Sequence, residues 1–127
     1  IKTAVSEVTE CHDVHMTEGG CGWLSAVVSI TPSTPDDGRM AIDAALAGHR
    51  SMKMVTIVNR DIDVSDPVRV EWAMMTRWQP DRDTVILSDQ KGSSLDPSRN
   101  PDGTTSKIGY DATLSPDTDP SPYISVQ

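Results

Sequence analysis

Three acidic residues in one short segment have a spacing at which carboxylates can bind divalent cations. Asp61, Asp63 and Asp66 follow an apolar run and offer the oxygen ligands that Ca²⁺ and Mg²⁺ prefer. The segment lacks the glycine and the terminal glutamate of a calcium-binding loop. We therefore interpret the three carboxylates as turn-forming and helix-capping groups, and we predict no metal site.

A second group of possible ligands consists of Cys11, His12 and His15. A structural zinc site needs four ligands, and these residues are too few and too close in sequence. They are more typical of side chains that alternate along a strand. Cys21 is the other cysteine; a disulfide with Cys11 is geometrically possible, but without a dense cysteine framework or a secretory signal we favour two free, mostly buried thiols.

Length and charge restrict the function classes. The 127 residues are enough for one domain with a modest core, and the net charge of −8 argues against a nucleic-acid partner, because phosphate binding needs a basic face. No apolar run approaches the roughly 20 residues that cross a bilayer, so we expect a soluble, cytoplasmic protein. The chain begins at Ile1 without an initiator methionine, which suggests a fragment or a processed product.

The N-terminal half predicts strand, turn, strand and helix. Residues 5–16 alternate loosely, as in an exposed strand or strand pair, and residues 23–30 are a largely apolar strand after a glycine-rich turn. Asp36 or Asp37 can cap a helix that ends at Gly48. Its apolar stripe contains Met40, Ala41, Ala44, Ala45 and Leu46.

The second half predicts a buried strand over residues 52–58, a helix that begins at Asp66-Pro67, and a short strand over residues 84–87. Val68, Trp72 and Met75 share one face of that helix, which we predict to be core. A long loop follows up to Gly103. The pattern predicts an α/β fold: a mixed, partly parallel sheet with helices packed on it, then the long loop and an irregular tail. We place the domain at residues 1–115 and a polar, proline-rich tail at residues 116–127.

Several ordered motifs resemble the carboxyl-terminal part of the UbiD family of decarboxylases, which use a prenylated flavin mononucleotide. Residues 19–30 are similar to the family's glycine turn and "HAVVSI" strand, with Ser25 where histidine is frequent. Residues 72–77 resemble its "WALATR" helix, although Asn59 and Arg60 replace acidic residues of the turn before it. The other matching segments are residues 61–64 (DIDV), 80–83 (PDRD), 95–98 (LDPS) and 106–113 (SKIGYDAT).

The resemblance implies the carboxyl-terminal portion of a reversible (de)carboxylase that acts on an aromatic or α,β-unsaturated carboxylic acid. The complete enzyme would use prenylated FMN, a divalent metal (Mn or Mg) and K. The family's catalytic Glu-Arg-Glu set lies upstream of the matched region, and none of Glu7, Glu10, Glu18 and Glu71 stands in the required motif. We therefore expect no catalytic residue here, no cofactor bound by this chain alone, and no activity from it alone.

The resemblance also implies a role as an active-site lid. In the family, the loop after the last strand presents apolar side chains to the substrate, which makes Leu95 the first candidate for the substrate wall and Ser93 the second. The alternative is a solvated loop that Leu95 merely anchors. His49 and Arg50 lie near the place of a basic residue that faces the cofactor phosphate, although the aligned position is Ala47. The alternative for these two is a solvated helix end, favoured by the helix dipole.

Arg77 and Arg82 flank a helix end rich in family signature, and we predict that they pair with Asp83 or Asp111. The expected partners of the chain are the upstream flavin-binding portion, or a separate subunit that contains it, and further copies in a homo-oligomer. A non-catalytic assembly module, or a small subunit of a heteromeric decarboxylase, is the alternative function.

Overall fold

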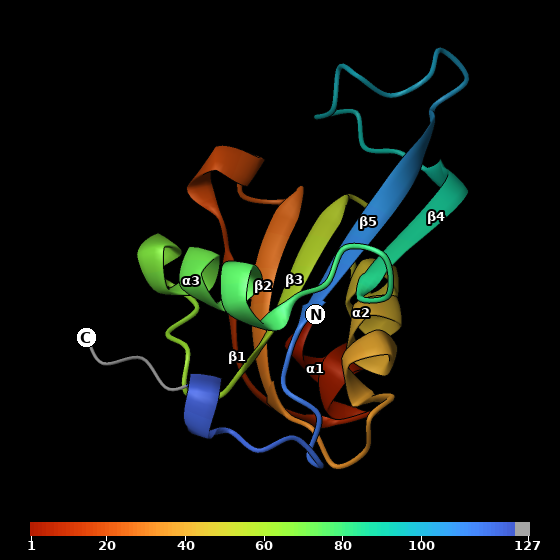
Figure 1. Ribbon diagram of the computed structural model, residues 1–127. Helices are drawn as coiled ribbons and strands as arrows, with labels where there is room; N and C mark the ends of the chain where they lie inside the picture. Colours follow the sequence, from red (N-terminus) through yellow and green to blue (C-terminus); the bar gives the residue numbers. More distant parts are fainter. Residues whose placement is uncertain (124–127) are drawn as a thin grey trace.

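Five strands form one mixed sheet with helices on both faces (Figure 1). The computed structural model describes residues 1–123. The strand order is β1-β2-β3-β5-β4, in which β2, β3 and β5 are parallel and both edge strands are antiparallel to their neighbours. The predicted fold class is confirmed. The elements are α1 (Lys2–Ser6), β1 (Glu10–Met16), η1 (Glu18–Gly20), β2 (Ser25–Thr31), α2 (Asp37–Gly48), β3 (Met54–Asn59), α3 (Pro67–Arg77), β4 (Thr84–Lys91), β5 (Thr104–Ala112) and η2 (Ser121–Tyr123).

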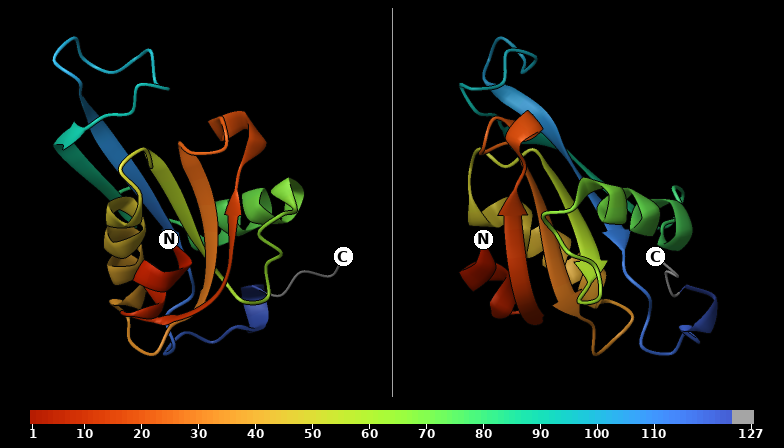
Figure 2. Two further views of the ribbon diagram at one scale, coloured as in Figure 1. Left: turned by 180° about the vertical axis from the view of Figure 1, so that it is seen from behind. Right: turned by 90° about the vertical axis from the view of Figure 1, so that its left-hand side faces the viewer.

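The central strands are buried because helices cover the sheet from both sides. β2 and β3 are mainly apolar and are buried along almost their whole length, as is usual for parallel strands with both faces covered. Seen edge-on, α1 and α2 lie on one face of the sheet and α3 lies on the other (Figure 2). Among the described residues, every helix is too short or too polar to cross a membrane.

The larger core lies between the sheet and α1 and α2. Ile42 of α2, Ile30 of β2 and Ile57 of β3 are fully buried there. α2 approaches β5 so closely that a Cβ atom on Gly109 would overlap the Ile42 side chain. A glycine is therefore required at this point of β5.

The smaller core, under α3, corrects the predicted phase of that helix. The helix begins as predicted, because the Asp66 carboxylate accepts hydrogen bonds from the amides of Val68 and Arg69. Val68 and Met75 are exposed, however, and Trp72 is only partly buried. The face against the sheet holds Val70, Ala73, Met74 and Arg77, which have the same helical spacing but a different phase, and Trp72 packs against this core from the edge of that face.

Neither aspartate caps α2 in the predicted way. Asp36 occupies the N-cap position without a side-chain hydrogen bond to the helix. The buried Asp37 carboxylate instead accepts hydrogen bonds from the Ser33 amide (2.8 Å) and from the hydroxyls of Thr34 (2.7 Å) and Thr9 (2.9 Å). These bonds, with that of Ser33 the strongest, lower the pKa of Asp37. Asp37 thus connects the β2–α2 turn to the start of β1.

Other boundaries also differ from the predictions. Val5 is fully buried in a short helix, so the predicted strand over residues 5–16 begins only at Glu10. β4 extends to Lys91, and residues 104–112, where no strand was predicted, form the second central strand β5. Both cysteines are free as expected, but Cys11 is only partly buried and Cys21 is exposed. The domain boundary at residue 115 stays a prediction, and residues 124–127 of the predicted tail lie outside the described residues.

Candidate active-site wall

One end of the sheet carries an apolar row that the described helices leave uncovered. Strand register places Met54 of β3 opposite Ile108 of β5, and Ile108 opposite Ile86 of β4. Because side chains alternate between faces, this row lies on the same face as Val58 and Ala112, which pack under α3. Ile86 is 65% exposed.

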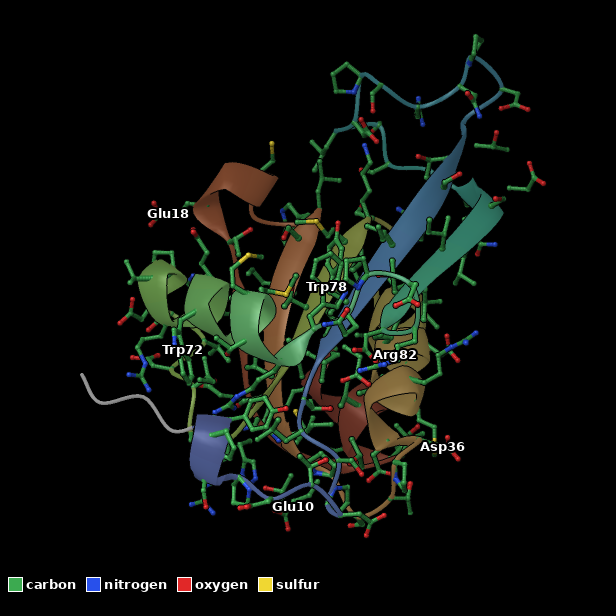
Figure 3. The ribbon with its side chains drawn as sticks, in the orientation of Figure 1. Glu10, Glu18, Asp36, Trp72, Trp78 and Arg82 are labelled. Atoms are coloured by element: carbon green, nitrogen blue, oxygen red, sulfur yellow. The ribbon has the colours of Figure 1, made fainter. Side chains whose placement is uncertain are left out.

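On this face of the sheet, cover by other side chains decreases from the row under α3 toward the loop of residues 92–103. In the middle row, the Trp78 ring meets the edge of Tyr110 with centroids 5.4 Å apart, and its Nε1 donates to the Thr84 hydroxyl at 3.1 Å. Figure 3 shows Trp78 over the sheet just beyond the end of α3. The upper parts of β3, β5 and β4 extend beyond α3 toward the loop of residues 92–103 (Figure 1). Ile86 is exposed and Met54 and Ile108 are half-buried, so this row is less covered than the part of the sheet under α3.

The loop of residues 92–103 is held against this end of the sheet by Asp96. Its buried carboxylate accepts hydrogen bonds from the amide (2.9 Å) and hydroxyl (2.6 Å) of Ser98 and forms an ion pair with Lys53 Nζ at 2.9 Å. The Ser98 hydroxyl and then the Lys53 ammonium lower the pKa of Asp96 to about 2. Lys53 immediately precedes β3, so the loop is tied to the start of the central strand.

The two predicted wall residues lie in this loop but differ in exposure. Leu95 is 48% exposed, whereas the Ser93 side chain is buried and its Oγ accepts a hydrogen bond from the Leu95 amide at 3.1 Å. Asp96, rather than Leu95, anchors the loop. Leu95 is thus held in place by its neighbours while its own side chain faces outward.

Arg50 and Ser93 meet in a polar pocket of about 210 Å³ at the same end of the sheet. His49 does not line this pocket. Its ring stacks on Trp23 with centroids 4.9 Å apart, and its Nδ1 accepts from the Ser51 amide at 3.1 Å. The lining residues come from the segment between α2 and β3, the end of β4 and the loop: Arg50, Ser51, Lys91, Gly92, Ser93, Ser94 and Arg99.

Sequence patterns did not single out the lysines beneath this site. Lys107 of β5 is buried and donates from Nζ to the Arg50 carbonyl at 3.1 Å, and its burial lowers the pKa of the ammonium group. Lys53 holds Asp96, as described above. The sequence signal that pointed to this arrangement was the Asp-Pro-Ser turn at residues 96–98. Such a turn indicates an aspartate, here Asp96, whose carboxylate accepts a hydrogen bond from a nearby amide.

The acidic segment after β3 pairs with α3 rather than forming an ion site. Arg77 donates to both oxygens of Asp61 at 2.9 and 2.8 Å, and to the Tyr123 carbonyl at 2.8 Å. The prediction that Arg77 pairs with Asp83 or Asp111 is therefore wrong. The hydrogen bonds from Arg77 lower the pKa of Asp61. Asp63 accepts from Ser65 in a turn, as predicted.

Among the described residues, the side chains that could bind a metal ion, and the glutamates that could act in catalysis, lie apart from one another. Within residues 1–123, no three His, Cys, Asp or Glu side chains come close enough together to hold a metal ion. Glu10 and Glu18 lie at opposite ends of β1 (Figure 3). A groove of about 450 Å³ between η1 and the start of α3 contains His15 but none of the predicted wall or phosphate residues.

Comparison with known proteins places this arrangement in a family. A family model described as "3-octaprenyl-4-hydroxybenzoate carboxy-lyase C-terminal domain" (UbiD_C) matches residues 1–112. The chain belongs to the UbiD family. This UbiD domain is 52% identical over 106 residues to the anhydromevalonate phosphate decarboxylase of Methanothermobacter thermautotrophicus, which covers 84% of the chain and 25% of the relative. Identity to the gallate decarboxylase of Lactiplantibacillus plantarum is 32% over 114 residues, covering 80% of the chain and 23% of the relative.

Solved structures agree with this assignment. The UbiD-class enzyme HmfF from Pelotomaculum thermopropionicum, in complex with FMN, has a TM-score of 0.92 and 34% identity, and the match covers 98% of this chain and 28% of HmfF. An evolved dimeric form of HmfF in complex with prFMN has a TM-score of 0.75 and 29% identity, with 98% and 27% covered. The UbiD chain described here spans about a quarter of the length of the curated relatives it matches.

Proposed function

We propose that this chain is the carboxyl-terminal portion of a UbiD-type reversible (de)carboxylase for an aromatic or α,β-unsaturated carboxylic acid, and that it serves as active-site lid and oligomerisation domain. The family match over residues 1–112 carries the proposal. Between the two substrate classes we favour a phosphorylated unsaturated acid. The relative at 52% identity is named for a phosphate-bearing substrate, whereas the gallate decarboxylase is 32% identical.

In this proposal the uncovered end of the sheet is the wall of the active site. The row Met54, Ile108 and Ile86 packs against the flavin-binding portion, and burial of these side chains drives closure of the lid. Leu95 presents an apolar surface to the substrate, and Ser93 shapes the pocket behind it. The exposure of Leu95 and the anchoring of its loop through Asp96 support this assignment.

The cofactor and its metal belong to the preceding portion of the enzyme. Prenylated FMN, when bound there with a divalent metal (Mn or Mg) and K, supplies the carbon chemistry of decarboxylation. Among the described residues, no group of His, Cys, Asp or Glu side chains is suited to hold a metal ion, and Asp96 and Asp61 are paired with Lys53 and Arg77, so the donor set does not fit the metal. The contribution of this chain is to exclude water and orient the acid, and His49 and Arg50 are its candidates for donating to the cofactor phosphate.

Two measurements test the division of labour. The complete enzyme, produced with prenylated FMN, is expected to release CO2 from a phosphorylated unsaturated acid, while the 127-residue chain purified alone should show neither flavin absorbance nor activity. Flavin colour that stays with the isolated chain through gel filtration would refute the proposal. So would a complete enzyme that holds the flavin and processes no unsaturated or aromatic acid.

The exposed face of α3 favours the second candidate, an assembly module or small subunit of a heteromeric decarboxylase. Val68 and Met75 are exposed about two helical turns apart on its outer side, where another copy or a catalytic subunit could pack. Co-purification of the chain with a separately encoded flavoprotein would support this candidate. A single longer polypeptide that contains both portions would exclude it.

A further inference from the structure

The pocket beside Ser93 concentrates positive charge in an acidic protein. The chain has a net charge of −8, yet Arg50, Lys91 and Arg99 line one pocket together. Within the described residues, the lining contains three cations and three hydroxyl groups but no carboxylate. This local composition is the reverse of the composition of the whole chain, which suggests a bound anion.

These cations are also free to bind a ligand. Within residues 1–123, the side chains of Arg50, Lys91 and Arg99 make no ion pair and no hydrogen bond. Lys53, by contrast, is paired with Asp96. Asp96 is the acid of the neighbouring turn, and its carboxylate is already satisfied by Lys53 and Ser98.

We propose that this pocket binds the phosphoryl group of the substrate. Guanidinium groups and hydroxyls are the donors that recognise the oxygens of a phosphate monoester, and arginine does so through two parallel N–H bonds. The volume of about 210 Å³ equals roughly seven water molecules and is sufficient for a phosphoryl group. Binding here leaves the carboxylate end of the acid to extend past Ser93 toward Leu95.

The assignment to the substrate rests on the proposed function. Ser93 belongs both to this pocket and to the proposed substrate wall, so a ligand that fills the pocket lies next to the wall. Lys107 adds positive charge beneath the pocket through its contact with the Arg50 carbonyl at 3.1 Å. A phosphate of the flavin has the same chemistry as that of the substrate, and the experiment separates the two.

The test uses Lys91→Gln and Arg99→Gln in the complete enzyme, with Arg39→Gln as matched control. Arg39 is an exposed cation of α2 that pairs with Asp43 away from the pocket, so its replacement changes the net charge equally. We expect each pocket variant to lower kcat/KM for a phosphorylated acid about 10- to 100-fold, mainly through KM. For the same acid without phosphate, the pocket variants should lose much less kcat/KM, because this acid has no phosphoryl group for the pocket to bind. Inorganic phosphate, titrated by calorimetry, should bind the wild type and the control more tightly than the variants.

Each outcome of this experiment has one meaning. Loss of flavin absorbance in the pocket variants, with KM for the phosphorylated acid unchanged, would overturn the inference and assign the pocket to the cofactor. Equal kinetics and equal phosphate binding in all four proteins would also overturn it. A wild-type enzyme that holds the flavin but acts on neither acid would instead overturn the proposed function on which the inference rests.

Discussion

Replacement of Asp96 by asparagine tests the anchor that positions the proposed substrate wall. Asp96 Oδ1 accepts from the Ser98 amide and hydroxyl, and Oδ2 faces Lys53 Nζ at 2.9 Å. Asparagine keeps the first acceptor but presents an N–H donor to the ammonium group. Asp102 is the matched control, because it makes the same turn with Thr104 (2.9 and 2.6 Å), has an exposed side chain and forms no ion pair with the described residues.

The expected cost follows from the geometry of the ion pair. A hydrogen bond between charged groups contributes about 1.5–3 kcal/mol. The Lys53 side chain is 38% exposed, so water screens the pair, and we expect Asp96→Asn to lower the free energy of unfolding by about 1–2 kcal/mol at pH 7. Urea unfolding of both variants measures this difference, and Asp102→Asn should leave the midpoint close to that of the wild type.

The pH dependence provides a second check with a defined sign. The pKa of Asp96 is lowered from 3.8 to about 2 in the folded protein, so its contribution is complete above the unfolded pKa and is lost as the pH falls toward 2. The stability difference between wild type and Asp96→Asn should therefore be largest near neutral pH and shrink between about pH 4 and pH 2. The proposed role of the Lys53 bridge would be refuted if Asp96→Asn and Asp102→Asn lowered the free energy of unfolding equally. It would also be refuted if the stability difference between wild type and Asp96→Asn did not change with pH.

Three further outcomes are expected. In the complete enzyme, Leu95→Ala should alter kcat/KM across a panel of acids more than it alters the urea midpoint, because the side chain is half exposed. An unchanged order of preference among the acids would show that Leu95 is only a surface residue. Gly109→Ala should destabilise the fold by about 1–3 kcal/mol, since α2 occupies the space, and Gly19→Ala, which has open space around it, serves as the neutral control in thermal unfolding. Asp61→Ala leaves the buried guanidinium of Arg77 without its carboxylate and should cost about 2–3 kcal/mol, less than for a fully buried pair because Asp61 is half exposed. A melting temperature equal to that of the wild type would contradict this last expectation.

Local signals in the sequence predicted those elements whose cause is itself local. Asp66-Pro67 starts α3 because a carboxylate cap and a proline at the first helical position act within one turn. The apolar run of β3 predicts a central strand because such a run needs cover on both faces. The family motifs likewise lie in contiguous segments and are confirmed by the family match.

The errors arose where a distant contact decides the structure. β5 contains Lys107, Gly109 and Asp111, whose residue types are depleted in strands, and pairing with β3 and β4 along both of its edges fixes it as a strand. The phase of α3 depends on which residues meet the sheet, and Arg77 lies inside because Asp61 and Tyr123 supply its acceptors. Spacing alone cannot distinguish that face from the one with Val68 and Met75.

The sequence by itself determined the family, the buried strands β2 and β3 and the loop that contains Ser93 and Leu95. Only the tertiary structure brought Arg50, Lys91 and Arg99 into one pocket. They come from the segment after α2, the end of β4 and the loop of residues 92–103. The pairing of β4 with β5 and the Lys53–Asp96 bridge bring these three segments together. Charges far apart in a flexible chain are screened by water and salt. Folding fixes them side by side, and a site for an anion results.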